Sequence, residues 1–329
     1  VPIGTGPYQI AEVQQGNQVR LARFDDYTSR DEPANGYGGG KTAYLDEVVL
    51  ITSPEAAVRA AGLEAGDFDF ALNLPSDSLP RFSANPDITL YTPYQGSLDF
   101  ALNSSTGIMS NPLVRQAFVA ALDMDQMMLA AFGDPTLYRV DGGLWPQETA
   151  WWTDTGTANY NQKDIEKARS LLQEAGYDGT PLRWMTTREN AGYYETAVVA
   201  EQLLEQAGFV VELEIVDFAT ILSRRSDPTV WEVFQTGFSI QPDPTQYLVF
   251  DCNWPAFWCD EEKDRLVEVL AADRPFEDRY AAWEDLQTYY WEYLPAVKVG
   301  DYFNLYGSST RVHDYPALNQ VIWYNVWVN

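Results

Sequence analysis

The sequence has 329 residues, 46% of them hydrophobic, and a formal net charge of −27, so it is long enough for two acidic globular domains. Its 48 acidic residues outnumber its 21 basic ones, which argues against nucleic acid as a partner, because phosphates are bound by patches of Lys and Arg. It contains no run of about 18 apolar residues, so we expect no membrane-spanning segment within these residues.

The first part of the chain predicts short strands around one helix. Residues 48–51 and residues 69–72 are apolar enough to predict two strands. Between them, Ser53 is the expected N-cap of a helix over residues 56–65, and Gly66 is expected to end that helix in the left-handed conformation. A strand, a helix and a second strand in this order predict a βαβ crossover with parallel strands.

The middle of the chain predicts a larger α/β region. Residues 94–103 are extended and mixed in polarity, and Asn111 then opens a helix whose apolar residues recur at helical spacing. Two further amphipathic helices are predicted at residues 165–175 and 195–207. Because each ends at a glycine and is followed by a short apolar strand, we expect helices and strands to alternate here.

Two more helices are predicted before the chain becomes strand-like again near its end. They cover residues 261–271 and 277–293, and Pro275 separates them because proline cannot continue a helix. Three aromatic residues at helical spacing in the second helix are expected in the core: Trp283, Tyr290 and Trp291.

The two cysteines, Cys252 and Cys259, are separated by six residues. With no accompanying cluster of His or Cys, this spacing makes a poor zinc site. A disulfide fits better and indicates an oxidising compartment, where a loop of this size would contribute about 2–3 kcal/mol to stability. The alternative is a pair of reduced, buried thiols.

Catalytic arrangements find no positive support in the sequence. A single histidine, His313, excludes a multi-histidine metal site, and a structural role fits it better than a catalytic one. The glycine-rich residues 36–40 match neither a phosphate-binding loop nor a dinucleotide fingerprint. We therefore expect neither an enzyme nor a cofactor or metal site.

Aromatic residues make up 14% of the chain, with 11 Trp and 20 Tyr. Many lie in polar, turn-like sequence, which suits a pocket for an amphiphilic solute because Tyr and Trp combine a large rigid surface with a polar group. The alternative is that most of them pack in cores and loops. Arg188, beside a predicted helix start, is either an anion-binding residue or the partner of Glu189 or Glu195.

The order of several segments resembles the family 5 extracellular solute-binding proteins, the peptide, opine, nickel and oligosaccharide receptors of ABC importers. The segments are GTGPY at 4–8, FDDY at 24–27, YLDEV at 44–48, LEAGDFD at 63–69, VRQAF at 114–118 with ALD at 121–123, and KARSLLQEAGY at 167–177. The resemblance implies an α/β fold of the periplasmic binding protein-like II type, with two lobes of mixed sheets joined by a hinge. We expect residues 1–98 and 296–329 in the first lobe, and residues 99–295 in the second.

The position of the GTGPY segment suggests that an N-terminal part precedes these residues in the whole protein. In the family this turn lies well inside the chain, whereas here it begins at residue 4. We expect a C-terminal fragment with an incomplete first lobe, and a natural minimal member is the alternative. The implied location is periplasmic or extracellular, with any membrane anchor in the missing N-terminal part. The acidic composition suits either a saline habitat or an ordinary exported protein.

The resemblance also indicates where a ligand would bind. Residues 234–244 resemble the second-lobe segment at the cleft, and Phe238 stands where peptide-binding members have an Asp that holds the peptide's α-amino group. Asp243 has a helix cap as its expected role. Residues 323–327 resemble the final strand of the first lobe, near the cleft floor. The candidate ligand-binding residues of the whole sequence are Tyr94, Trp145, Trp152, Arg188, Tyr193, Phe238, Asp243, Trp254, Trp323 and Asn325.

The function implied is the capture of a solute between two lobes and its delivery to the membrane permease subunits of an ABC importer, by a monomer. Because Phe238 offers an ammonium group no carboxylate, oligosaccharide-like or other neutral polar solutes rank above peptide-like ones, and metal chelates or haem follow. The alternatives are a secreted carbohydrate-active hydrolase with an aromatic-lined cleft, and a sensory or structural protein that uses the fold without transport.

Overall fold

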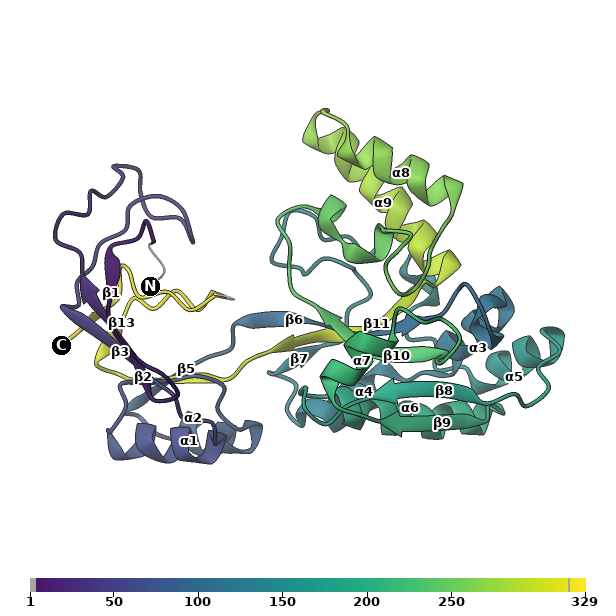
Figure 1. Cartoon of the computed structure of the whole chain (residues 1–329), viewed down its shortest axis with the longest axis horizontal. Coiled ribbons are helices and arrows are strands. Elements are labelled where there is room, and N and C mark those ends of the chain that lie inside the picture. Colours follow the sequence, from purple (N-terminus) through teal and green to yellow (C-terminus); the bar gives the residue numbers. More distant parts are fainter. Residues whose placement is uncertain (1–3, 319) are drawn as a thin grey trace. The chain divides into compact units, whose positions relative to one another are not determined.

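The computed structural model describes residues 4–318 and 320–329, which form two compact units (Figure 1). Unit 1 comprises the chain up to Tyr94 together with Phe303–Asn329, and unit 2 comprises Gln95–Tyr302. The chain leaves unit 1 within strand β6 (Tyr94–Leu102) and returns to it within strand β11 (Ala296–Phe303). Two strands therefore connect the units.

In its described residues, unit 1 contains small antiparallel sheets and two short α-helices. Its elements are β1 (Tyr8–Gln14), β2 (Gln18–Arg23), β3 (Glu47–Ile51), α1 (Ala56–Ala65), β4 (Phe70–Ala71), α2 (Leu79–Ser83), β5 (Ile88–Tyr91), β12 (Tyr306–Ser309), β13 (Val312–His313) and β14 (Trp327–Val328). One sheet has the order β1-β2-β3, a second has the order β4-β12-β5, and β13 pairs with β14. Because β3 and β4 lie in different sheets, the predicted βαβ crossover with parallel strands is wrong.

Helix α1 shows which local signals hold and which fail. Its bounds, Ala56–Ala65, and the left-handed Gly66 that ends it (φ 78°) confirm the prediction. The predicted cap by Ser53 is wrong, since the N-cap is Glu55 and makes no side-chain capping bond. Ser53 lies two residues before the N-cap. Its backbone carbonyl accepts a hydrogen bond from the guanidinium of Arg59 over 2.7 Å.

One cluster of side chains in unit 1 is largely aromatic. Phe70 lies at its centre, with its ring 4.5 Å from that of Tyr315 and 5.2 Å from that of Trp323, measured between centroids. Tyr91 and Tyr306 complete this group at 5.8 and 6.2 Å from Phe70. Strands from the early and the late part of the chain are thus joined by one cluster of rings.

Unit 2 is built on a six-stranded sheet. Its strands, in sheet order, are β7 (Tyr138–Arg139), β11, β6, β10 (Val233–Phe238), β8 (Leu182–Thr186) and β9 (Val211–Ile215). Strand β10 runs antiparallel to β6 and parallel to β8, and β8 runs parallel to β9, so the sheet is mixed. The mixed α/β fold expected from the sequence is confirmed.

Seven helices accompany this sheet within the described residues. They are α3 (Pro112–Ala121), α4 (Met124–Phe132), α5 (Ile165–Glu174), α6 (Tyr193–Ala207), α7 (Phe218–Arg224), α8 (Glu261–Ala271) and α9 (Phe276–Tyr293). Helix α3 packs against α5 and α4 against α6, while α8 and α9 form a separate pair (Figure 1). The core between sheet and helices is again aromatic, with the ring of Phe100 4.6 Å from Trp184 and 6.3 Å from Phe118.

Capping signals explain where several of these helices begin and end. The side chains of Asn111 and Asp260 accept hydrogen bonds from backbone amides at the starts of α3 and α8. Gly208 ends α6 in the left-handed conformation. Helices α8 and α9 are separated at Pro275, as predicted. The three aromatic residues expected in the core of α9 are fully buried: Trp283, Tyr290 and Trp291.

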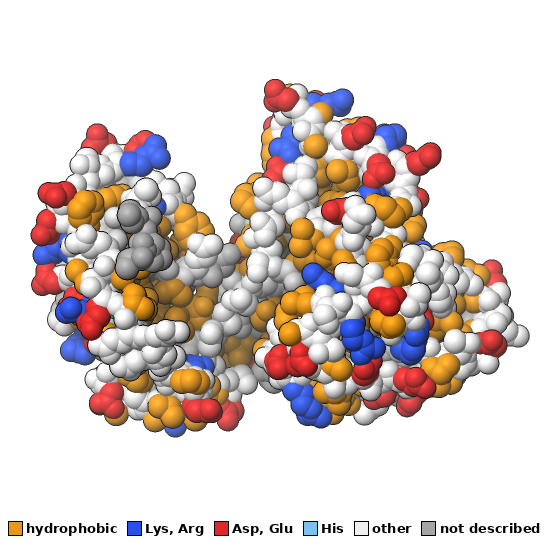
Figure 2. Space-filling model, in the orientation of Figure 1, with side chains coloured by type: hydrophobic (Ala, Val, Ile, Leu, Met, Phe, Trp, Pro, Cys, Tyr) orange, Lys and Arg blue, Asp and Glu red, His pale blue; other side chains and the backbone are white. Residues whose placement is uncertain are grey.

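Figure 2 shows Asp and Glu side chains distributed over the visible surface of each unit, in keeping with the net charge of −27. Apolar side chains are interspersed among them, as on most folded proteins. Within the described residues, every helix is too short or too polar to cross a membrane.

Candidate functional site

Phe238 lies in a group of aromatic side chains at the end of strand β10, which we call the Phe238 cluster: Trp145, Phe238, Tyr247 and Trp254. The ring of Phe238 is 4.7 Å from Tyr247 and 5.5 Å from Trp254. Trp145 lies 5.5 Å from Tyr247 and donates its indole N–H to the carbonyl of Gln241 over 3.1 Å. Phe238 is half-buried, whereas the other three are buried, so Phe238 is the member most open to solvent.

The backbone of β6 and β10 fixes the position of Phe238. Phe238 pairs with Ser97 and Gly237 pairs with Leu98 in the antiparallel ladder. A Cβ atom on Gly96 would lie 2.5 Å from the carbonyl oxygen of Phe238, so glycine is required where the two strands approach. The sequence presents Phe238 at the last position of β10, where the chain turns into the segment that carries Asp243.

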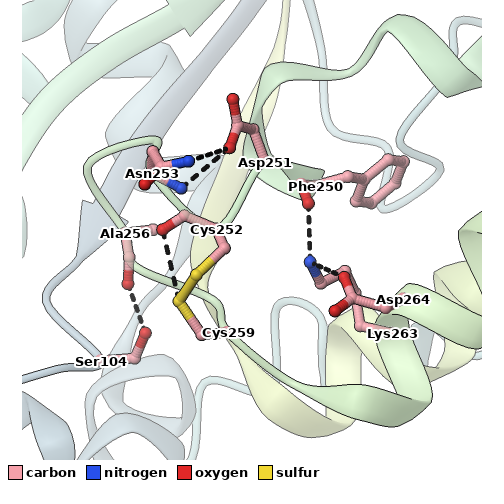
Figure 3. Close-up of a disulfide and its surroundings, with 9 residues drawn as sticks. All are labelled: Ser104, Phe250, Asp251, Cys252, Asn253, Ala256, Cys259, Lys263 and Asp264. Carbon is pink, nitrogen blue, oxygen red and sulfur yellow. Dashed lines mark hydrogen bonds and ion pairs between the residues drawn. A yellow bond between two sulfur atoms is a disulfide. The ribbon is translucent and has the colours of Figure 1, made fainter.

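A disulfide between Cys252 and Cys259 closes the loop that carries Trp254, which confirms the predicted pairing (Figure 3). Ser104 holds this loop through hydrogen bonds from its backbone amide and its hydroxyl to the carbonyl of Ala256. The buried Lys263 lies nearby and donates to the carbonyl of Phe250 over 2.7 Å (Figure 3). Covalent and polar restraints therefore hold Trp254 against Phe238.

Asp243 has a structural role next to this cluster. Its carboxylate caps the 3-10 turn that follows, accepting from the Thr245 amide over 3.0 Å, and it forms an ion pair with Arg279 at 2.6 Å. Burial raises the pKa of Asp243, but the bonds from Thr245 and Arg279 outweigh it and leave the pKa below its ordinary value. Asp243 and Arg279 also border a cavity of about 330 Å³ whose lining includes Asp273 and Arg274.

Three other candidates of unit 2 make contacts of their own. Tyr193 is buried behind β10, where a Cβ on Gly237 would lie 3.0 Å from its hydroxyl. Trp152 donates its indole N–H to Asp141 over 2.9 Å. The guanidinium of Arg188 lies 3.5 Å from the ring centroid of Tyr194, in a cation–π contact that neither sequence interpretation of Arg188 anticipated.

The candidates of unit 1 are similarly engaged. The amide of Asn325 accepts from the backbone of Thr42 over 2.8 Å and donates to the carbonyl of Gly40 over 3.1 Å, so it fixes that segment. The ring of Tyr94 lies 5.9 Å from that of Phe303. Trp323 belongs to the aromatic core around Phe70.

Trp323 also lines a cavity of about 460 Å³ in unit 1 that the sequence did not indicate. Most of its lining is apolar, and half of the lining residues come from β3, β4, β13 and β14. The one basic residue in this lining is Arg59. Its guanidinium donates to four backbone carbonyls, so it stabilises the local backbone.

A largely buried charged network on β6, β11 and the edge strand β7 was also missed by sequence reasoning. It contains Asp99 on β6, Lys298 and Asp301 on β11, and Arg139 on β7. Lys298 and Arg139 each contact the Asp301 carboxylate at 2.8 Å. The sequence does show a charged residue between apolar neighbours, as in Leu98-Asp99-Phe100. This pattern does not predict which charged residues on neighbouring strands lie close to it.

Metal and histidine chemistry have little support in the geometry. Among the described residues, no group of three or more His, Cys, Asp and Glu side chains is arranged to hold a metal ion. His313 stacks on Trp327 with 3.9 Å between ring centroids.

Comparison with known proteins places this geometry in context. A solved ABC transporter substrate binding protein, CtaP from Listeria monocytogenes, matches the fold with a TM-score of 0.84 and 20% identity, over 99% of this chain and 67% of that one. In sequence, the chain is 28% identical to the "probable peptide ABC transporter periplasmic-binding protein y4tO" of Sinorhizobium fredii, over 91% of this chain and 60% of the relative. It is 26% identical to the oligopeptide-binding protein AppA of Bacillus subtilis, over 76% of this chain and 46% of the relative.

These 329 residues therefore span about three fifths or less of the length of the two curated relatives named here. The family described as bacterial extracellular solute-binding proteins, family 5 Middle, matches residues 1–254, which is more than half of the chain. The order of segments that suggested the family lies within this matched region. The chain thus belongs to the family 5 bacterial extracellular solute-binding proteins.

Proposed function

We propose that the protein is the substrate-binding component of an ABC importer, which captures a solute outside the cytoplasm and delivers it to a membrane permease. Membership of the family and the names of its relatives support this proposal. The relatives named are binding proteins, which gives no support to the alternative of a secreted hydrolase. As partners we propose a small-molecule or oligomeric solute and the permease subunits, with the receptor itself a monomer.

The proposed mechanism is capture by closure of two lobes. The lobes are residues 1–98 with 296–329, and residues 99–295. Rotation would be absorbed in the connecting segments, near residues 94–103 and 293–298. Closure is stabilised when a solute contacts both lobes, because a ligand shifts a conformational equilibrium only by its differential affinity for the two states.

The Phe238 cluster is the observation that carries the proposed ligand class. Phe238 is half-buried among Tyr247, Trp254 and Trp145, and none of these rings bears a charge. An ammonium group placed on Phe238 would meet aromatic rings but no carboxylate partner at that position, so it would be bound less tightly than beside an Asp. Flat aromatic faces suit the apolar faces of sugar rings and other neutral polar solutes. We therefore rank oligosaccharide-like solutes above peptide-like ones.

The other candidate residues support this site to different degrees. Trp145 and Trp254 belong to the cluster, and Tyr193 lies behind it against Gly237. We propose that these residues shape the surface around Phe238. Asp243, Trp152, Arg188, Tyr94, Trp323 and Asn325 remain candidates, each already engaged in contacts within its own unit.

A screen of neutral sugars, opines and short peptides against the full-length protein tests the function. A bound solute should raise the melting temperature by mass action and reduce the radius of gyration in small-angle scattering as the lobes close. If none of the solutes raises the melting temperature, the proposed receptor function is wrong.

A single substitution tests the ligand class separately. Phe238→Asp restores the carboxylate that peptide-binding members carry, so it should weaken sugar binding and strengthen the binding of peptides with a free amino terminus, measured by calorimetry. Phe24→Asp is the matched control, because Phe24 is exposed in unit 1 and should leave both affinities unchanged. Tight peptide binding by the wild type that Phe238→Asp does not improve would reverse our ranking.

A further inference from the structure

A buried carboxyl group lies on β6, one of the two strands that connect the units. Asp99 is 0% exposed and pairs with Thr236 across the ladder between β6 and β10. Its Oδ2 accepts a hydrogen bond from the hydroxyl of Ser97 over 2.5 Å, while its Oδ1 has no hydrogen-bond partner among the described residues. A buried carboxylate needs a cation or several donors, and one hydroxyl is a poor environment for a full negative charge.

The cations of the network are engaged with other acceptors. Lys298 and Arg139 both contact Asp301, which is itself 0% exposed, and Arg139 also pairs with Glu148 at 2.8 Å. Lys298 attracts the charge of Asp99, but Asp301 repels it. If Asp99 were ionised, it would be a second buried carboxylate beside Asp301. Lys298 and Arg139 already neutralise the charge of Asp301, so neither is free to pair with Asp99.

Three neutral hydroxyls also interact electrostatically with Asp99. They come from three different elements: Tyr193 on α6, Tyr290 on α9 and Tyr302 on β11. Burial is the main cause that raises the pKa of each of these tyrosines, so they stay protonated and bring no charge of their own. Burial is likewise the main cause that raises the pKa of Asp99 to about 7, against the lowering effects of Ser97 and Lys298.

From this arrangement we propose that Asp99 is a proton-binding site. The folded protein holds Asp99 as a neutral carboxylic acid, and loss of its proton weakens the packing of β6 against β10 and β11. Because β6 carries the chain from one unit to the other, the proton controls the stability of a connecting strand. Ser97, which bonds to Asp99, pairs with Phe238, so Asp99 lies two residue pairs along the ladder from Phe238. This inference holds whether or not the protein binds a solute.

The direction of the pH effect follows from the two protonation equilibria. Asp99 titrates near its ordinary value of 3.8 when the chain is unfolded and near 7 when it is folded. Between these values the folded state holds a proton that the unfolded state has lost, so the contribution of Asp99 to stability decreases as the pH rises through this range. Above about pH 7 both states are ionised, and the full cost of the buried charge remains.

The test compares the wild type with Asp99→Asn, in the full chain, by thermal unfolding between pH 5.5 and 8.5. Asparagine is neutral and keeps an oxygen for Ser97, so the variant should be the more stable protein at pH 8.5, and its advantage should shrink toward pH 5.5. Asp31→Asn is the control, because Asp31 is exposed and its loss should not change the pH profile. Identical profiles for the wild type and Asp99→Asn would overturn the proposal.

An infrared titration of the wild type gives an answer even if the variant does not fold. At pH 6 exposed carboxyl groups are ionised, so a carbonyl absorption typical of a protonated carboxyl should come from a buried acid and should disappear by pH 8. Hydrogen exchange, corrected for its intrinsic pH dependence, should accelerate over the same range at the amides of β6 and β10 but not at those of β9. A wild type without any protonated carboxyl at pH 6 would show that Asp99 is ionised and the proposal wrong.

Discussion

Phe238 and the charged network of Asp99, Lys298, Asp301 and Arg139 lie on strands of one sheet, but the Phe238 cluster and the network are stabilised by different forces. The cluster consists of neutral rings in contact, with Trp254 held by a disulfide-closed loop. The network consists of charges removed from water, which are stable only while each is paired or neutralised. The first should be indifferent to pH and the second should depend on it. The aromatic surface around Phe238 should therefore keep its structure as the pH changes, while the stability of strand β6 in the same sheet changes with pH.

Removal of the central cation of the network should have the largest effect. Lys298→Met leaves Asp301 with less positive charge around it and should lower the free energy of unfolding by about 3–5 kcal/mol in urea titrations at pH 8. The loss should be smaller at pH 6, where buried carboxyl groups can take up protons. Lys167→Met, on the exposed face of α5, is the control and should change stability little. A loss that is equal at both pH values would break the distinction between the two regions.

Truncation within the aromatic region should be nearly as costly but independent of pH. Trp254→Ala removes a buried ring from Phe238 and should lower the free energy of unfolding by about 3 kcal/mol at pH 6 and at pH 8 alike. Trp254→Phe, which keeps an aromatic ring in place, should lose less than half as much. A loss for Trp254→Ala that doubles between the two pH values would mean that the cluster is coupled to the charged network.

Removal of the disulfide should show how much of the stability of the loop that carries Trp254 comes from the covalent bond and how much from the packing of its rings. The double variant Cys252→Ser and Cys259→Ser should lose about 2–3 kcal/mol of stability, because the unfolded chain regains the freedom of an open loop. The wild type treated with a reducing agent should lose the same amount, and the variant should show no response to that agent. If stability is unchanged in both, the contacts of Ser104 and Trp258 are sufficient to hold the loop.

The smallest effect is expected at the edge of the aromatic region, where Asp243 caps a turn and pairs with Arg279. Asp243→Ala should cost about 1 kcal/mol at pH 7. Since the pKa of Asp243 in the folded protein is below its ordinary value of 3.8, this contribution is present above that value and is lost as the pH falls below it. Asp273→Ala, on the same cavity, is the control. A difference from wild type that does not shrink as the pH falls below 3.8 would show that the carboxylate charge is not responsible.

Local signals predicted much of the secondary structure. The bounds of α1, the left-handed Gly66, the break at Pro275 and the buried rings of α9 were all predicted from the sequence. The spacing of the cysteines indicated the disulfide, and the order of segments indicated the family. Each of these features depends on residues close together in the chain, or on a pattern shared with relatives.

The sequence by itself determined helices α1, α3, α5, α6, α8 and α9, the disulfide, the acidic surface and the family, because those follow from neighbouring residues and overall composition. It did not indicate helices α2, α4 and α7. Only the tertiary structure decided that Arg59 engages the backbone of Ser53 outside the helix, that β3 and β4 lie in different sheets, and that the amide of Asn325 is bound to the segment near Thr42. It also brought Asp99 within reach of Lys298 and Asp301, about 200 residues away in sequence. The physical reason is that strand pairing and side-chain burial depend on residues far away in the sequence. Local sequence patterns cannot predict which distant strand will be the partner.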